Sequence, residues 1–189
     1  NAHVIPPVLD YSKQELIGIM VIQGPIKKCR YAKIMSIDHT HDIALLKLEG
    51  EPLPALELAD SDTLKEGQSV AFTGFPIGMA LQQLVTHRGM VSSIGPIVLP
   101  ALRSQQLDVK MVKRLRDPFN IIQLDATAYP GNSGSALYDP ETGKVYGIID
   151  AVYVKATKES AITQPSGITY AIPSNFIHEL LKNNGVSNK

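Results

Sequence analysis

Short runs of apolar and β-branched residues recur along the chain, separated by Gly, Pro, Asn and Asp. Runs of this kind, bounded by turn-forming residues, are typical of β-strands. They predict strands over Leu16–Gln23, Cys29–Ile37, Ile43–Leu48, Ser69–Thr73, Leu84–Ile94, Ile121–Leu124, Val145–Val154 and Ile168–Ile172. Many short strands, without a regular alternation of strand and helix, indicate an all-β barrel or sandwich.

One helix is predicted near the C-terminus, over residues 174–185. Apolar side chains recur there at helical spacing, at Phe176, Ile177, Leu180 and Leu181. Ser174 is expected to cap the helix, and Asn184-Gly185 is expected to end it.

The segment from Pro96 to Pro118 breaks the strand pattern and is rich in basic side chains, at Arg103, Lys110, Lys113, Arg114 and Arg116. Its apolar residues Leu107, Met111 and Leu115 fall four apart, which allows a short amphipathic helix. Two interpretations stay open. The segment is a solvated insertion loop, or it is a regulatory or partner-docking loop ahead of the next strand.

Composition narrows the function classes. The chain has 189 residues, which suits one domain or two small halves that share a core. Lys plus Arg and Asp plus Glu both number 18, so no net basic field attracts nucleic acid or an anionic membrane. No apolar run reaches membrane-spanning length.

Cysteine usage and the N-terminus leave the compartment open. The single cysteine, Cys29, excludes an internal disulfide, which fits a cytosolic protein and also an exported protein that is stable without bridges. The sequence opens on Asn1 with neither an initiator Met nor a signal peptide. We therefore expect either a processed chain or a piece of a longer one.

The strongest chemical signal is a glycine-rich turn around Ser133, with the sequence GNSGS at residues 131–135 after Tyr129-Pro130. Glycine allows unusual backbone dihedrals and leaves room for a substrate. We expect Gly131, Asn132 and Ser133 to form an oxyanion hole, with the N–H groups of Gly131 and Ser133 as donors. Similar turns also occur in ordinary loops, so the catalytic interpretation needs a base and an acid.

Five histidines compete as the base, at positions 3, 39, 41, 87 and 178. Asp42 stands at the start of an apolar strand, where a partly buried acid can orient an imidazole; the alternative is a solvated turn residue or strand cap. A metal site of Asp38, His39, His41 and Asp42 is a weaker alternative. Ligands from one short turn converge poorly, and no second ligand cluster occurs elsewhere.

Six segments resemble, in the same order, motifs of the HtrA/Deg serine proteases of the chymotrypsin-like superfamily. They are NAHVI at 1–5, DIALLKL at 42–48, GFPIG at 74–78, Thr86 with GMVS at 89–92, QLDA at 123–126 leading to GNSG at 131–134, and GITYAIP at 167–173. The resemblance implies that His3 is the general base and acid, that Asp42 orients it, and that Ser133 is the nucleophile. His3 is preferred over His41, because His41 adjoins Asp42 in the chain and adjacent strand residues point to opposite faces.

The resemblance implies an all-β, chymotrypsin-like double antiparallel β-barrel with a C-terminal helix. The expected division is a partial N-terminal barrel at 1–80, a C-terminal barrel at 81–173 and the helix at 174–185. Family members have two strands before the catalytic histidine, so the first barrel is expected to lack its N-terminal strands, and no PDZ domain is expected after the helix. Ser135 also departs from the family motif, in which a glycine stands at this position.

Substrate preference is expected from three further positions. Thr127, six residues before Ser133, corresponds to the floor of the P1 pocket in the superfamily, and Ile168 and Tyr170 are expected as its walls. An uncharged, narrowed pocket favours a small or medium aliphatic P1 residue. The strand around Ile149, Asp150 and Ala151 is expected to pair with the substrate backbone. Asp150 either favours a basic subsite residue or is a surface-facing carboxylate.

The sequence thus predicts a serine endopeptidase that acts on unfolded or damaged polypeptides, with no metal or organic cofactor. The expected partners are polypeptide substrates, without nucleic acid or a membrane span, and a homo-oligomer is left open. Two alternatives remain: a catalytically silent domain that binds unfolded chains or partner proteins, and an esterase-like hydrolase with the same triad. The resemblance favours a periplasmic or other exported compartment, and a cytoplasmic one stays open.

Overall fold

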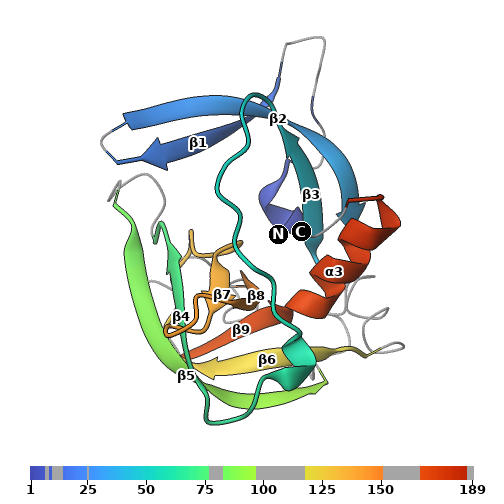
Figure 1. The fold of residues 1–189 in the computed structure, drawn as a ribbon. Coiled ribbons are helices and arrows are strands. Elements are labelled where there is room, and N and C mark those ends of the chain that lie inside the picture. The colour runs from blue at the N-terminus through green and yellow to red at the C-terminus, as the bar shows by residue number, and fades with distance from the viewer. Residues whose placement is uncertain are drawn as a thin grey trace, which may run out of the picture. The chain divides into compact units, whose positions relative to one another are not determined.

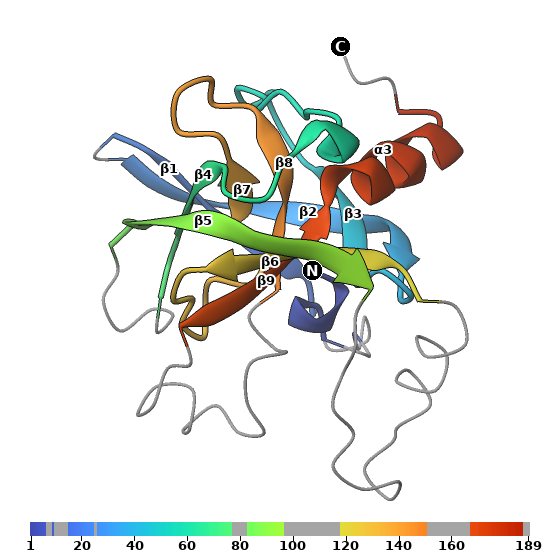
Figure 2. The same ribbon diagram turned by 90° about the horizontal axis from the view of Figure 1, so that it is seen from below.

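The computed structural model describes residues 1–6, 9, 15–24, 26–76, 83–96, 118–150 and 167–186 (Figures 1 and 2). The chain divides into two compact units, which are named here by their β-structure. The sheet unit comprises Asn1–Ala55 and Glu179–Lys189, and the barrel unit comprises Leu56–His178. Residues 97–117, which make up the basic segment where the sequence allows a short amphipathic helix, lie outside the described residues.

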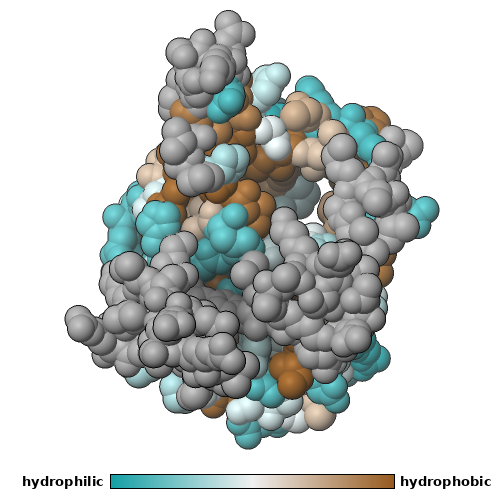
Figure 3. All heavy atoms as spheres, turned by 180° about the vertical axis from the view of Figure 1, so that it is seen from behind, coloured by the Kyte–Doolittle hydropathy of each residue, from teal (hydrophilic) through white to brown (hydrophobic). Residues whose placement is uncertain are grey.

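The sheet unit is built on three antiparallel strands in the order β1 (Ile17–Gln23), β2 (Ile26–Asp38) and β3 (Ile43–Leu48). A 3₁₀ turn, η1 (Ala2–Val4), precedes them. Half-buried and exposed positions alternate along the first five residues of β1, as expected for a sheet with one covered face. Met20 and Tyr31, opposite that face, are more than half exposed, and the space-filling view also shows apolar side chains at the surface (Figure 3).

The barrel unit contains a closed antiparallel barrel in the order β4-β5-β6-β9-β8-β7. The strands are β4 (Ser69–Gly74), β5 (Val85–Pro96), β6 (Asn120–Asp125), β7 (Ala136–Tyr138), β8 (Val145–Asp150) and β9 (Ile168–Pro173). Phe72, Leu124, Leu137 and Ile149 are fully buried and form much of its core. Closure pairs β4 with β7, so this sheet has no free edge.

All the predicted strands are present, and Ile43–Leu48 has the predicted bounds. Three differences remain. Strand β7 was missed, because three residues are too few to give a pattern. The predicted strand Val145–Val154 is described only as far as Asp150, since the following residues lie outside the described part. The predicted division at residue 80 is also displaced: β4 bonds to both β5 and β7, so the barrel begins at Ser69.

The C-terminal helix α3 spans Ser174–Asn183, close to the predicted range. Its end is the expected one: Gly185 has φ 66°, and the N–H groups of Gly185 and Val186 donate to the carbonyls of Lys182 and Leu181. At its start, the Ser174 hydroxyl donates to the Ala59 carbonyl at 2.7 Å, which anchors the helix to the segment before β4. Among the described residues, no helix is long and apolar enough to cross a membrane.

Candidate active site

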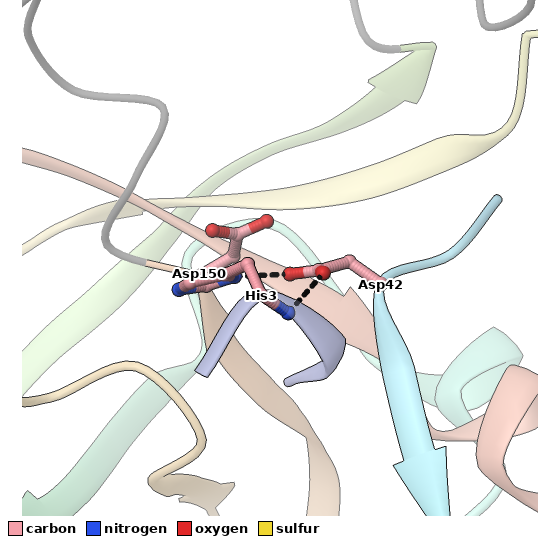
Figure 4. Close-up of side chains that lie close together, drawn as sticks. All are labelled: His3, Asp42 and Asp150. Carbon is pink, nitrogen blue, oxygen red and sulfur yellow. Dashed lines mark hydrogen bonds and ion pairs between the residues drawn. The ribbon is translucent and has the colours of Figure 1, made fainter. Parts of the chain in front are cut away.

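The sheet unit brings His3 and Asp42 together. The ring Nδ1–H of His3 donates to Asp42 Oδ2 at 2.5 Å, and the backbone N–H of His3 donates to Asp42 Oδ1 at 2.9 Å (Figure 4). The Asp42 carbonyl accepts from the backbone N–H of Ala2 at 2.9 Å. All three oxygens of Asp42 therefore hold residues 2 and 3, and the bond at Nδ1 directs the other ring nitrogen of His3, Nε2, away from the acid.

Asp42 has an unusual backbone and a stabilised charge. Its φ is 58°, in the left-handed region, which Asp tolerates better than most residues but still at a cost. The residue is 6% exposed. Burial opposes ionisation of its carboxyl group, but the hydrogen bonds and charge of His3 outweigh burial and hold the pKa below 3.8. Asp42 is thus an ionised acid fixed against an imidazole.

A second His–Asp pair lies in the same β2–β3 turn. The ring Nδ1–H of His41 donates to Asp38 Oδ2 at 2.6 Å, and Asp38 Oδ1 accepts from the backbone N–H groups of Thr40 and His41. Burial raises the pKa of Asp38, but these bonds and the charge of His41 outweigh it, so the pKa lies below 3.8. His41 therefore bonds to Asp38, and Asp42 bonds to His3.

The other candidate histidines have different surroundings. His39 is exposed in the β2–β3 turn. His178 lies on α3 with Nε2 3.3 Å from the Ala59 carbonyl, so it is not on the wet face of the helix. His87, on β5, stacks on Phe72 with ring centroids 4.9 Å apart.

The barrel unit carries the Ser133 turn between β6 and β7. Gly131 has φ 103° and Gly134 has φ 89°, values that a side chain would strain. The Asn132 N–H donates to the Tyr129 carbonyl at 3.0 Å, and the Ser135 N–H donates to the Asn132 carbonyl at 3.0 Å. The glycines and these bonds define a tight turn that presents Ser133 half-buried.

Two backbone donors of this turn are available to an anion. Within the described part of the chain, the N–H groups of Gly131 and Ser133 have no hydrogen-bond acceptor. The N–H of Asn132 donates to the Tyr129 carbonyl, so the available donors are the two that the sequence analysis named. The remaining pair fits the donors of an oxyanion hole.

The Asn132 side chain anchors the turn in the barrel. It is completely buried, and its Nδ2 lies 3.5 Å from Nε2 of His87. Burial lowers the pKa of His87, which favours the neutral ring that can accept this bond. The sequence did not indicate this contact, because 45 residues separate the two positions.

Gly74 explains how Ser135 fits beside Ser133. A Cβ on Gly74 would lie 2.8 Å from Asn132 Oδ1 and would clash with the Ser135 hydroxyl. The missing side chain at Gly74 therefore makes room for the serine that departs from the family motif.

The predicted pocket residues share one neighbourhood in the barrel unit. Thr127 is half-buried just after β6, and Ile168 and Tyr170 occupy the same face of β9. The buried hydroxyl of Thr169 donates to the Ala126 carbonyl at 2.8 Å and accepts from the Ala128 N–H at 2.9 Å. Sequence analysis missed Thr169, which fixes Thr127 from both sides.

The expected substrate-pairing strand needs correction. The N–H of Ile149 donates to the Ser135 carbonyl, its carbonyl accepts from Gly134, and its side chain is buried in the core. Ile149 therefore has no backbone group to pair with a substrate. Asp150 is 1% exposed, so it is not a surface-facing carboxylate. Ala151 lies outside the described residues.

Comparison with known proteins defines the class. A family model described as "Trypsin-like peptidase domain" matches residues 1–148, and the chain belongs to this family. It is 30% identical over 187 residues to "Serine protease Do-like HtrA" of Lactobacillus helveticus, covering 96% of this chain and 39% of that protein. It is 36% identical over 143 residues to "Probable periplasmic serine endoprotease DegP-like" of Marinomonas sp. (strain MWYL1), covering 76% and 25%.

A solved structure agrees with these relatives. "HtrA-type protease AlgW with decapeptide" superposes with a TM-score of 0.64 at 28% identity, covering 88% of this chain and 44% of that one. The predicted fold class and the resemblance to HtrA/Deg proteases are confirmed. The chain spans less than half the length of these relatives.

Proposed function

We propose that this chain is a serine endopeptidase domain in which Ser133 is the nucleophile, His3 the general base and acid, and Asp42 the orienting acid. The observation that carries the proposal is a pair of hydrogen bonds to the Asp42 carboxylate. One comes from the ring of His3 and the other from its backbone N–H. The Ser133 turn, with its two available N–H donors, and the trypsin-like family support it.

In the proposed reaction, Ser133 Oγ attacks a peptide carbonyl and transfers its proton to His3 Nε2. Asp42 stays ionised and stabilises the imidazolium through the bond at Nδ1. The N–H groups of Gly131 and Ser133 hold the negative oxygen of the tetrahedral intermediate. His3 then protonates the leaving amine, and a water molecule releases the acyl group by the same route.

The proposed P1 preference is a small or medium aliphatic residue. Thr127, Ile168 and Tyr170 supply no charge, so a Lys or Arg head group would lose hydration without gaining an ionic partner. We expect cleavage after Val, Ala, Leu, Ile or Met. Profiling with a peptide library tests this, and a dominant Lys or Arg at P1 would contradict it.

The proposed substrates are unfolded or damaged polypeptides, and the names of the relatives as Do-like and DegP-like proteases support this class. A fluorophosphonate probe tests the nucleophile: we expect labelling at Ser133 that is lost in Ser133→Ala. Absence of labelling in the wild type would favour the catalytically silent binding domain. Turnover of small esters without cleavage of casein would favour an esterase.

A further inference from the structure

We propose that Asp38 and His41 form a positioning clamp for the His3–Asp42 pair, a role separate from the triad itself. The inference rests on the proposed function for its kinetic consequences, but its structural part concerns the β2–β3 turn alone. "The clamp" below means the side chains of Asp38 and His41.

Asp38 holds both neighbours of Asp42 in the chain, His41 through the clamp and Ile43 through its own backbone. On one side, the Asp38 carboxylate binds the backbone N–H of His41 at 3.1 Å and its ring at 2.6 Å. On the other side, the Asp38 backbone pairs with Ile43, the first residue of β3, whose side chain is 3% exposed. Asp42 therefore lies between two residues that Asp38 holds.

Such restraint is required because Asp42 has a left-handed backbone, with φ 58°. A non-glycine residue stays in that region only when its surroundings determine the conformation. In this conformation the Asp42 carbonyl reaches Ala2 while its carboxylate reaches His3. If the turn relaxed to an ordinary backbone conformation, these acceptors would no longer converge on residues 2 and 3.

His41 gives the clamp its second contact. A bare carboxylate at Asp38 could bind the two turn amides through Oδ1 and leave Oδ2 to solvent. The His41 ring instead binds Oδ2, so the carboxylate is held through both oxygens. The two carboxylates of this turn, at Asp38 and Asp42, are thereby each paired with a different imidazole.

The test uses four variants of the intact chain: Asp38→Ala, Asp38→Asn, His41→Ala and, as the matched control in the same turn, His39→Ala. Misplacement of about 1 Å can lower a rate by 10²-fold, so we expect Asp38→Ala to lower kcat by about 10- to 100-fold. KM should change by less than about threefold, because no substrate contact is removed. Asp38→Asn keeps an acceptor for the turn amides and should recover most of kcat; His41→Ala should fall between these two, and His39→Ala should equal the wild type.

A second readout does not depend on catalysis. The His3 Nδ1 proton should give a far-downfield proton NMR resonance in the wild type and in His39→Ala. It should be lost or broadened in Asp38→Ala, and restored in Asp38→Asn. A kcat and a resonance in Asp38→Ala that both match His39→Ala would overturn the clamp. If the wild type is inactive and unlabelled at Ser133, the proposed function fails, and the resonance alone decides on the clamp.

Discussion

Different forces stabilise the two units. In the barrel unit, each strand is paired on both sides and surrounds side chains such as Phe72 and Leu124, which are completely buried. In the sheet unit, β1 and β3 are edge strands within the described residues, and its buried apolar side chains include the small residues Ala2 and Ala32. Its best-defined feature is a polar one, the set of bonds that Asp38 and Asp42 make around the β2–β3 turn.

This difference matters because each unit carries different residues of the proposed triad. The Ser133 turn depends on packing: Asn132 is buried, and Gly131 and Gly134 supply the required backbone. The His3–Asp42 pair depends on hydrogen bonds to a buried carboxylate. Packing defects and charge changes should therefore affect the two parts unequally.

The largest expected effect is the loss of turnover when a residue of the proposed triad is removed from either unit. Ser133→Ala in the barrel unit and His3→Ala in the sheet unit should each lower turnover by about 10⁴-fold or more, because the members of a catalytic triad act together. The double variant should be hardly worse than either single one. Hydrolysis of a chromogenic peptide measures this, with circular dichroism as the control for folding. Near-wild-type activity in either single variant would end the serine-protease interpretation.

The same chemical change should have unequal effects on stability in the two units. Leu124→Ala removes a completely buried side chain from the barrel core and should lower the free energy of unfolding by about 2–5 kcal/mol. Leu46→Ala, at a half-buried position on β3, should lower it by about 1 kcal/mol. Urea unfolding measures both values. Equal losses would show that the sheet unit has a tighter core than its burial indicates.

A smaller effect on kcat is expected from a change in packing beside the Ser133 turn. Gly74→Ala should lower kcat by roughly 10-fold, because the new methyl group pushes Ser135 and Asn132 and so displaces the turn. Adding Ser135→Gly removes one of the two clashing atoms and should recover part of the activity. Kinetics of the single and double variants measure the coupling. No recovery would mean that Asn132 alone transmits the defect.

The smallest expected effect is in the response to acid. Burial lowers the pKa of His87 below 6.5, so the unfolded chain takes up this proton first, and barrel stability should begin to fall as the pH drops below about 6.5. The pKa values of Asp38 and Asp42 are lowered from 3.8, so their contribution to the sheet unit is lost only below that pH. Hydrogen exchange at several pH values measures the stability of each unit separately. His87→Gln should remove the loss of barrel stability that begins below about pH 6.5. A wild-type barrel that shows no loss between about pH 7 and 5 would contradict the role given to His87.

Most of the fold could be predicted, because local patterns determine it. Alternating or continuous apolar runs marked the strands, and the end of α3 at Asn184-Gly185 followed from the preference of glycine for a left-handed backbone. Strand β7 could not be predicted, since its three residues are too few to give a pattern and are defined by pairing with Phe72, far away in the chain, and with Gly147 across the next turn.

The candidate site was only partly predictable, for the same reason. The geometry of His3 and Asp42 agrees with the expected pairing, although their catalytic roles stay a proposal. The contacts of Asn132 with His87, and of Thr169 with the segment around Thr127, join residues more than forty positions apart and have no local signal. Ile149 was misjudged because a strand pattern does not show which edge of the strand is already paired.

The strand order of the barrel also has a consequence for how the protein is made. In the barrel, β9, the last strand among the described residues, lies between β6 and β8. During synthesis, β4 to β8 can pair as one open sheet in the order β6-β5-β4-β7-β8. The ring stays open until Ile168–Pro173 leaves the ribosome and fills the gap. Until then, the nascent chain has two exposed edges, which can pair wrongly or be bound by a chaperone.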